Sequence, residues 1–220
     1  MQNDSARTDN SRIGVFGGSF DPVHVGHLIV ADVLRHALKL ERVIFLPVGQ
    51  PPHKSTQALA PDADRLAMLR LALECAPGFE ISTVDLDRPG VSFTSESLRI
   101  VRGELPPDCE LYFLIGQDSL RDFPTWHAPD EIVRQARLGV ATRPGVQTTV
   151  AAVNRAVPDT TGRIELVRVP LIGVASSTLR ASIRAGGPYR FQVPPPVADY
   201  IAERGLYRDG GTPAPPVARA

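Results

Sequence analysis

The stretch RIGVFGGSFDPVHVGHL, residues 12–28, predicts a strand, a glycine-rich turn and the start of a helix. Glycines directly after a strand let the backbone approach a ligand, because no Cβ intervenes. The first N–H groups of the following helix and its positive dipole end are suited to binding an anion. His24 and His27 lie at this point, one turn apart, with Gly26 leaving room between them. The stretch therefore predicts an anion site where imidazoles donate hydrogen bonds to phosphoryl oxygens.

The same stretch has other interpretations. It is neither a Walker loop nor a Gly-x-Gly-x-x-Gly dinucleotide fingerprint. His-x-x-His could ligate a metal, but the sequence shows no obvious third and fourth ligands. The two histidines could also simply cap the helix or pack against it. The placement of both rings after a glycine turn favours the functional interpretation.

Strand-like and helix-like segments alternate along the rest of the chain. Strands are expected at residues 12–17, 42–48, 79–84, 110–115, 138–142 and 164–169. Helices are expected at residues 25–38, 62–75, 94–102, 129–135, 177–185 and 196–204. This alternation predicts an α/β fold with a Rossmann-like, doubly wound parallel sheet and a small helical C-terminal part. Such sheets bind ligands beyond the carboxyl ends of their strands, so chemistry is expected in the segments that follow them.

Composition limits the classes of partner. The chain has 220 residues and a formal net charge of zero, from 24 basic and 24 acidic residues. This balance gives no reason to expect a nucleic acid or a membrane as partner. We expect one domain over residues 12–207, between flexible tails at 1–11 and 208–220 that are small, polar or proline-rich.

The location of the protein is expected to be cytoplasmic. No apolar run approaches the roughly 20 residues that span a bilayer, and residues 1–10 lack the apolar stretch of a signal peptide. Cys75 and Cys109 are far apart, in no metal-like spacing, and are expected to be reduced thiols. The sequence leaves the oligomeric state open, a homo-oligomer included.

Several separate motifs carry a resemblance to a known family. His24-x-Gly-His27 after a glycine-rich turn resembles the nucleotidyltransferase superfamily that shares its fold with class I aminoacyl-tRNA synthetases. The full string GGSFDPVHVGHL resembles bacterial nicotinate-nucleotide adenylyltransferases within it. Further matches are PPHK (51–54), LIGQDSL (114–120), FPTW (123–126), RPG (143–145), SSTLR (176–180), and YI with GLY (200–201 and 205–207).

The resemblance implies an ATP site built from several loops. Catalytic roles would fall to His24, His27, Lys54 and Arg180. ATP would be bound by Gly17, Gly18, Ser19, Phe20, Gly26, Asp118, Arg143, Ser177 and Thr178. By this likeness Asp118 binds the adenosine ribose, Arg143 lies along the adenine, and the residues of the SSTLR motif hold the β- and γ-phosphates.

Plainer roles exist for some of these residues. A hydroxyl of the 176–178 segment could serve merely as the cap of its helix. A cap would not explain Arg180, which is expected in the first turn of that helix. A cation there opposes the helix dipole unless an anion binds. Asp118 could cap a helix that starts at Ser119.

The resemblance also implies the acceptor site. Nicotinate mononucleotide would contact His53, Thr94, Trp126 and His127. Trp126 would stack on the pyridine ring, and Thr94 would offer its hydroxyl and helix N–H groups to the carboxylate. As alternatives, Trp126 could be a satellite core residue, and the loop of His53 and Lys54 a merely exposed basic loop. Glu96 and Ser97, on the same helix as Thr94, depart from the family's usual residues, as does Ala175 before the serines.

The implied reaction joins the adenylyl group of ATP to the mononucleotide phosphate, with Mg²⁺ bridging phosphates mainly through water and substrate oxygens. No residue of the chain is assigned as a metal ligand. Sibling transferases acting on nicotinamide mononucleotide or phosphopantetheine are the nearest alternatives. A non-catalytic nucleotide sensor and a metal hydrolase are further ones.

Overall fold

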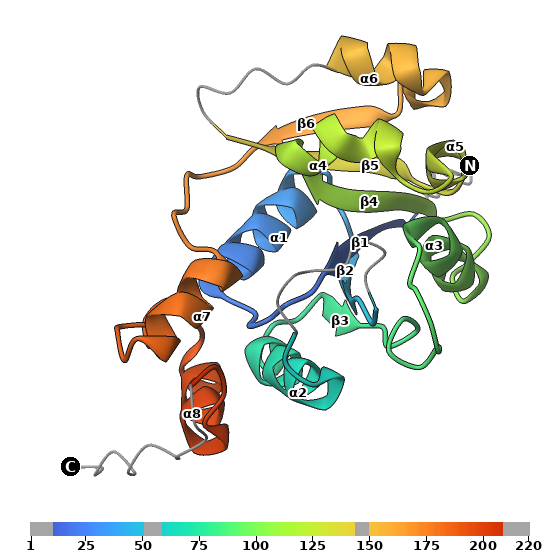
Figure 1. The fold of residues 1–220 in the computed structure, drawn as a ribbon. Coiled ribbons are helices and arrows are strands. Elements are labelled where there is room, and N and C mark those ends of the chain that lie inside the picture. Colours follow the sequence, from blue (N-terminus) through green and yellow to red (C-terminus); the bar gives the residue numbers. More distant parts are fainter. Residues whose placement is uncertain (1–10, 51–58, 144–149, 209–220) are drawn as a thin grey trace, which may run out of the picture.

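Six parallel strands form the centre of the molecule, in the order β3-β2-β1-β4-β5-β6 (Figure 1). The computed structural model describes residues 11–50, 59–143 and 150–208. The strands are β1 (Arg12–Gly18), β2 (Arg42–Pro47), β3 (Phe79–Ile81), β4 (Glu110–Gly116), β5 (Arg137–Thr142) and β6 (Ile164–Arg168). The strand order reverses between β1 and β4, so their carboxyl ends form the crevice in which doubly wound sheets bind ligands.

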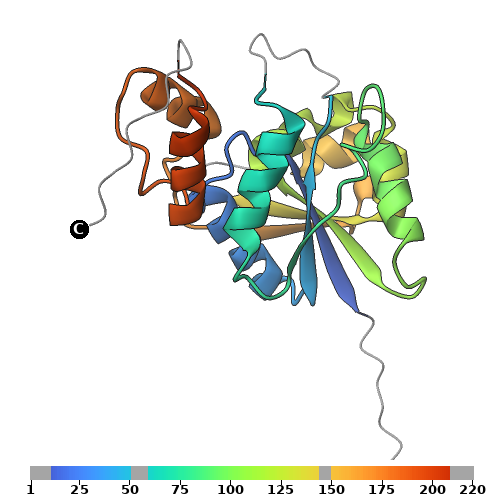
Figure 2. The same ribbon diagram turned by 90° about the horizontal axis from the view of Figure 1, so that it is seen from below.

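Helices cover both faces of this sheet, as Figures 1 and 2 show. The helices are α1 (Val25–Ala37), α2 (Asp62–Leu73), α3 (Thr94–Gly103), α4 (Gln117–Asp122), α5 (Pro129–Gln135), α6 (Val150–Ala156), α7 (Ser176–Arg184) and α8 (Pro195–Arg204), with short 3₁₀ turns η1 (Phe123–Thr125) and η2 (Pro158–Thr160). None of these described helices is long and apolar enough to span a membrane.

Two apolar cores lie on the two sides of the sheet, because side chains alternate along each strand. One core joins strand residues such as Phe45 and Leu114 to helices α1, α2, α7 and α8. The other joins Val15 and Phe113 to α3, α4, α5 and α6. Both faces are therefore buried, as a parallel sheet requires.

The predicted fold class is confirmed, and every predicted strand and helix is present with its ends within three residues of those predicted. The largest strand shift is at β3, which ends at Ile81 and not at residue 84. Helix α6 was missed, because VAAVNRA is too short for a periodic pattern to stand out. The predicted tails lie outside the described residues except at Ser11 and Arg208.

The buried face of α2 is partly polar. Leu66 and Ala72 are only half-buried, whereas Asp64, Arg65 and Met68 are buried. Polar residues occupy this face because they have partners: Asp64 accepts hydrogen bonds from Tyr200 Oη (2.7 Å) and Arg204 Nε (3.2 Å) of α8. These bonds attach the C-terminal helix to α2.

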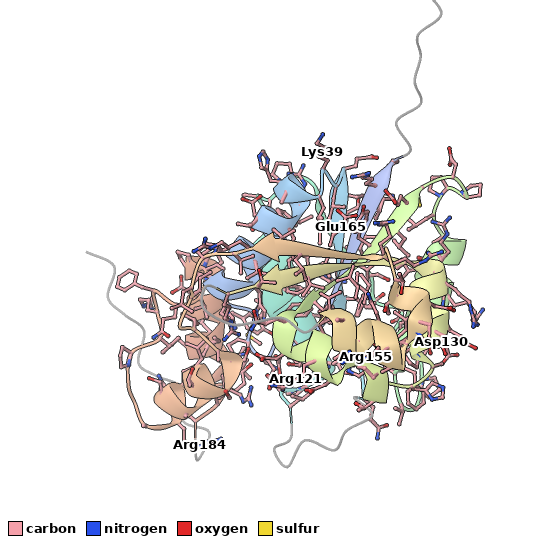
Figure 3. The ribbon with its side chains drawn as sticks, turned by 90° about the horizontal axis from the view of Figure 1, so that it is seen from above. Lys39, Arg121, Asp130, Arg155, Glu165 and Arg184 are labelled. Carbon is pink, nitrogen blue, oxygen red and sulfur yellow. The ribbon has the colours of Figure 1, made fainter. Side chains whose placement is uncertain are left out.

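The amino-terminal side of the sheet carries a separate charged cluster. Glu165, labelled on β6 in Figure 3, accepts hydrogen bonds from Tyr112 Oη (2.8 Å) and Arg137 Nε (3.0 Å). Tyr112 is buried. Its desolvation, and to a smaller extent its hydrogen bond to Glu165, raise the pKa of its hydroxyl. The cluster links β4, β5 and β6 in register.

Candidate active site

A cavity of about 730 Å³ opens at the carboxyl ends of the central strands. Its walls include the ends of β1, β2 and β4, the start of α3 and the segment after η1. Of the predicted site residues, the cavity is lined by Gly17, Gly18, His27, Thr94, Trp126 and His127. The structure therefore brings six of the predicted site residues together around one cavity.

Other predicted site residues do not line this cavity. They are Ser19, Phe20, His24, Gly26, Asp118, Arg143, Ser177, Thr178 and Arg180. His53 and Lys54 lie outside the described residues. Most of the predicted residues outside the cavity lie in the β1–α1 turn, next to it, or at the start of α7. The predicted site therefore has two parts, the cavity and this region beside it.

His24 and His27 form a reciprocal cap at the start of α1. His24 is the N-cap residue, and its Nδ1 accepts a hydrogen bond from His27 N at 3.3 Å, while His27 Nδ1 accepts one from His24 N at 3.3 Å. The two rings stack at 3.7 Å between centroids. Because both Nδ1 atoms accept, each neutral ring carries its proton on Nε2. The capping role considered from the sequence is therefore real, and it leaves each ring with an Nε2–H donor.

Both imidazoles are held in the neutral form. Burial lowers the pKa of His24 to about 4. Burial and the neighbouring His24 lower the pKa of His27 to about 3. At neutral pH the pair can therefore donate hydrogen bonds but carries no positive charge.

Gly26 is required by this stacked pair. A Cβ at this position would lie 2.9 Å from His24 Nδ1, closer than real Cβ contacts come. The prediction that Gly26 leaves room between the histidines is confirmed. In the same loop Phe20 has a positive φ of 48°, which is uncommon for a side chain of this size. The turn is thus held in a conformation that its surroundings must impose.

Arg65 of α2 imposes much of that conformation and was missed in the sequence. Its side chain is fully buried and donates to Ser19 O and Val48 O, both at 2.7 Å, and to Asp62 Oδ1 at 2.5 Å. The guanidinium thereby connects the ends of β1 and β2 with α2. The available signal was its position four residues before Leu69, which puts both residues on the same side of α2. Buried charges are kept only when paired.

Asp21 is a second organising residue that sequence reasoning did not single out. Its carboxylate is fully buried and accepts hydrogen bonds from Tyr207 Oη (2.7 Å) and Ala60 N (3.3 Å). Arg180 Nη1 donates to Asp21 O at 2.6 Å and lies 3.6 Å from Asp21 Oδ2. Burial, and then Asp21 itself, raises the pKa of Tyr207. One carboxylate therefore ties the β1–α1 loop to α7 and to the C-terminal segment.

Two expectations about α7 were wrong. The helix begins at Ser176, its N-cap residue is Ala175, and no side chain caps it. Ser176 Oγ instead donates to Pro22 O (3.0 Å), and Thr178 Oγ1 donates to Ala175 O (2.8 Å). Because the helix starts early, Arg180 is its fifth residue, beyond the first turn, and Asp21 already compensates its charge. Ser177 and Thr178 are exposed at the helix start.

Asp118 lies within the first turn of α4, so it does not cap a helix starting at Ser119. Its exposed carboxylate is 3.8 Å from Arg143 Nη2 and 3.9 Å from Arg121 Nη1. Gln117, which was missed, is buried and accepts a hydrogen bond from Arg143 N at 2.9 Å. Gln117 thus fixes the backbone at the carboxyl end of β5.

The far wall of the cavity is aromatic. Trp126 packs against Phe113 (6.1 Å between ring centroids) and Phe123 (5.6 Å) and also faces the cavity. The ring centroids of His127 and Phe93 are 4.2 Å apart. The core role considered for Trp126 and the predicted cavity role are therefore compatible.

Thr94 is the first residue of α3, and no side chain caps this helix start. The cavity beside it also contains polar residues that the sequence did not reveal. They are Asp85, Ser92 and Ser97. Asp85 is buried and follows the short β3 strand in a turn, where nothing in its spacing predicts a buried carboxylate.

The fold and the glycine–histidine turn define a class of nucleotide-transferring proteins. The cytidylyltransferase-like family model matches residues 15–181. The chain is 52% identical over 198 residues to a probable nicotinate-nucleotide adenylyltransferase of Thermomicrobium roseum, covering 90% of this chain and 92% of the relative. It is 44% identical to a protein of the same name from Symbiobacterium thermophilum, covering 91% and 97%. The chain belongs to the nicotinate-nucleotide adenylyltransferase family.

Solved structures show the same fold at lower identity. Plasmodium falciparum nicotinic acid mononucleotide adenylyltransferase complexed with APC matches with a TM-score of 0.70 and 20% identity, covering 90% of this chain and 98% of that one. The same enzyme complexed with NaAD also gives a TM-score of 0.70, at 19% identity. The predicted nucleotidyltransferase fold is confirmed.

Proposed function

We propose that this chain transfers the adenylyl group of ATP to the phosphate of nicotinate mononucleotide, giving nicotinate adenine dinucleotide and pyrophosphate in NAD biosynthesis. The names of its relatives support this reaction. The observation that carries the proposal is the reciprocal His24–His27 cap, which leaves the Nε2–H donor of His27 at a cavity wide enough for a nucleotide.

The reaction needs alignment and charge stabilisation more than acid–base catalysis. A phosphate oxygen of the mononucleotide forms a bond to the α-phosphorus of ATP, and the bond from that phosphorus to the bridging oxygen breaks. The electron pair leaves with pyrophosphate. Because the nucleophile is already an anion, no general base or covalent intermediate is required.

The two parts of the site divide the substrates. The triphosphate would lie along Gly17, Gly18, Ser19, Phe20 and Gly26 at the start of α1. Ser177 and Thr178 would bind its terminal phosphates from α7, and Arg180 would reach them from one turn further along this helix. Neutral Nε2–H donors of His24 and His27 would stabilise charge on the phosphoryl oxygens without reorganising. Asp118 would bind the ribose and Arg143 would lie along the adenine.

The acceptor would occupy the cavity. Trp126 would stack on the pyridine ring, and the start of α3 at Thr94 would receive the carboxylate. His127 would line the same wall, while His53 and Lys54 would grip phosphate from outside. A divalent ion, Mg²⁺, would neutralise phosphate charge while held by substrate oxygens and water.

The decisive experiment measures pyrophosphate release with ATP, Mg²⁺ and each of three acceptors: nicotinate mononucleotide, nicotinamide mononucleotide and phosphopantetheine. We expect the highest kcat/KM with nicotinate mononucleotide, and a dinucleotide product by mass spectrometry. Equal values for the acid and the amide would contradict the assignment of a carboxylate site. ATP binding without pyrophosphate release would show a sensor, and activity lost to a zinc chelator but not rescued by Mg²⁺ would show a metal hydrolase. A cytoplasmic location and a homo-oligomer stay predictions.

A further inference from the structure

A buried carboxylate lies where the acceptor's own carboxylate is expected. Asp85 is 4% exposed and lines the cavity together with Thr94 and Trp126. Two carboxylates in one partly desolvated cavity repel each other, and the repulsion is stronger than in water because the local dielectric is lower. An uncompensated Asp85 would therefore favour a neutral amide over an acid, against the function proposed above.

Arg88 compensates this charge from behind the cavity wall. Its Nη2 atom lies 2.7 Å from Asp85 Oδ1 and donates to Ser97 Oγ at 3.1 Å. Its Nη1 atom lies 3.0 Å from Glu96 Oε2 of α3, and its Nε donates to Val84 O at 3.0 Å. The guanidinium is thus fixed by four groups and bridges the β3–α3 segment to the first turn of α3. Arg88 itself is not part of the cavity lining.

The carboxylate cannot move away from the cavity easily. Ser97 Oγ donates to Asp85 Oδ1 at 2.5 Å, which holds the side chain against α3. The backbone of Asp85 is packed against Gly49, where a Cβ would lie only 2.3 Å from Asp85 O. Ser92 Oγ also approaches Asp85 O at 3.5 Å. The position of this negative charge is built into the fold.

We propose that Arg88 determines acceptor specificity: by neutralising Asp85 at the start of α3, it allows the cavity to take a mononucleotide with an anionic ring substituent. This inference rests on the proposed function and deepens it. Arg88 is a positioning residue that acts through Asp85. The two side chains have opposite effects on selectivity, because one supplies the negative charge and the other cancels it.

The test compares kcat/KM for nicotinate mononucleotide and nicotinamide mononucleotide at the same pH. Arg88→Gln should lower the acid-to-amide ratio by about 10-fold, and Asp85→Asn should raise it. Arg88→Lys, which keeps the charge, should restore most of the wild-type ratio. A purely structural role would lower both kcat/KM values together and leave their ratio unchanged, which would overturn the proposal.

Arg99→Gln is the matched control, because Arg99 is an exposed arginine on the same helix as Glu96. Its ratio should equal the wild-type ratio. Calorimetric titration of each variant with each mononucleotide gives a second readout that does not need turnover. If the wild-type chain forms no dinucleotide, the proposed function fails, while the binding ratios still decide the role of Arg88. If Arg88→Gln does not fold, an unchanged ratio in Asp85→Asn would overturn the inference.

Discussion

The two halves of the candidate site are built in different ways. The proposed acceptor half is a cavity that opens at the carboxyl ends of the central strands, and its wall residues Trp126 and His127 pack on Phe113, Phe123 and Phe93. The phosphate half lies at the starts of α1 and α7, and its polar groups already bond to other protein groups. Arg180 is the clearest case, since Nη1 donates to Asp21 O at 2.6 Å.

The two halves therefore recognise their substrates differently, one by shape and the other by charge. The acceptor half can select by fit because its walls exist before any ligand binds. The phosphate half is held by protein hydrogen bonds, some of which a triphosphate would exchange for bonds to its own oxygens. Substitutions in the phosphate half should therefore mainly change turnover and ATP binding, and substitutions in the acceptor half should mainly change KM for the mononucleotide.

The largest effect is expected from the histidine pair. His24→Ala and His27→Ala should each lower kcat by at least ~100-fold, because each removes a preorganised donor to the phosphoryl oxygens. Pyrophosphate release under saturating ATP and nicotinate mononucleotide measures this. His36→Ala is the control, since His36 is exposed in the last turn of the same helix. Turnover of either variant within threefold of wild type would refute the role.

The second largest effect is expected from Arg180→Gln. Hydrogen bonds to charged groups contribute about 1.5–3 kcal/mol, which corresponds to a loss of about 10- to 100-fold in kcat/KM for ATP. KM for the mononucleotide should change little. Arg184→Gln, one turn further along α7, is the control.

Tyr207→Phe sharpens this test, because it removes the hydroxyl that anchors Asp21 and leaves Arg180 in place. We expect a smaller loss of kcat/KM for ATP, again with little change in KM for the mononucleotide. An equal loss for both substrates in Arg180→Gln would contradict the division of the site.

The glycines and histidines of the candidate site could be predicted to lie together because their motif is local. The turn at residues 17–28 brings its glycines and histidines together within one strand–turn–helix unit, whatever the rest of the fold does. Arg65 and Asp21 act across long separations instead: Asp21 bonds to Tyr207, and Arg65 to Ser19. Which buried charge meets which partner depends on packing between elements, and no periodicity or spacing reports it.

The same reason explains the errors at α7. A run of Ser and Thr before a helix predicts a cap, but the Ser176 hydroxyl is used on Pro22 O, a group of the β1–α1 loop far away in sequence. The start of the helix is therefore set by tertiary contacts and not by the local capping preference of its residues.

A smaller effect is expected in the acceptor half. Trp126→Ala should raise KM for nicotinate mononucleotide by about 10-fold, since stacking on an aromatic side chain contributes about 1–3 kcal/mol per base. Trp126→Phe should retain most of the affinity. KM for ATP should stay near the wild-type value in both variants. A Trp126→Ala protein with an unchanged acceptor KM would show that the indole only packs against Phe113 and Phe123.

The smallest effect concerns stability and pH. The folded-state pKa values of His24 and His27, about 4 and about 3, lie below the value of 6.5 expected in the unfolded chain. Between these values the unfolded chain binds more protons, so stability falls as pH drops below about 6.5 and the loss ends near the folded values. From about pH 7 to pH 5, each histidine should remove roughly 1–2 kcal/mol from the free energy of unfolding.

Urea unfolding at both pH values measures this loss in wild type and in the double variant His24→Ala/His27→Ala. The double variant should lose less stability over the interval than wild type, because it lacks both histidines with lowered pKa values. The same pKa values keep both rings neutral from about pH 6 to pH 8, so the histidines should cause no change in kcat there. A kcat that falls on acidification from pH 8 to pH 6 would contradict the neutral-donor mechanism, because it would require rings that become charged within the working range.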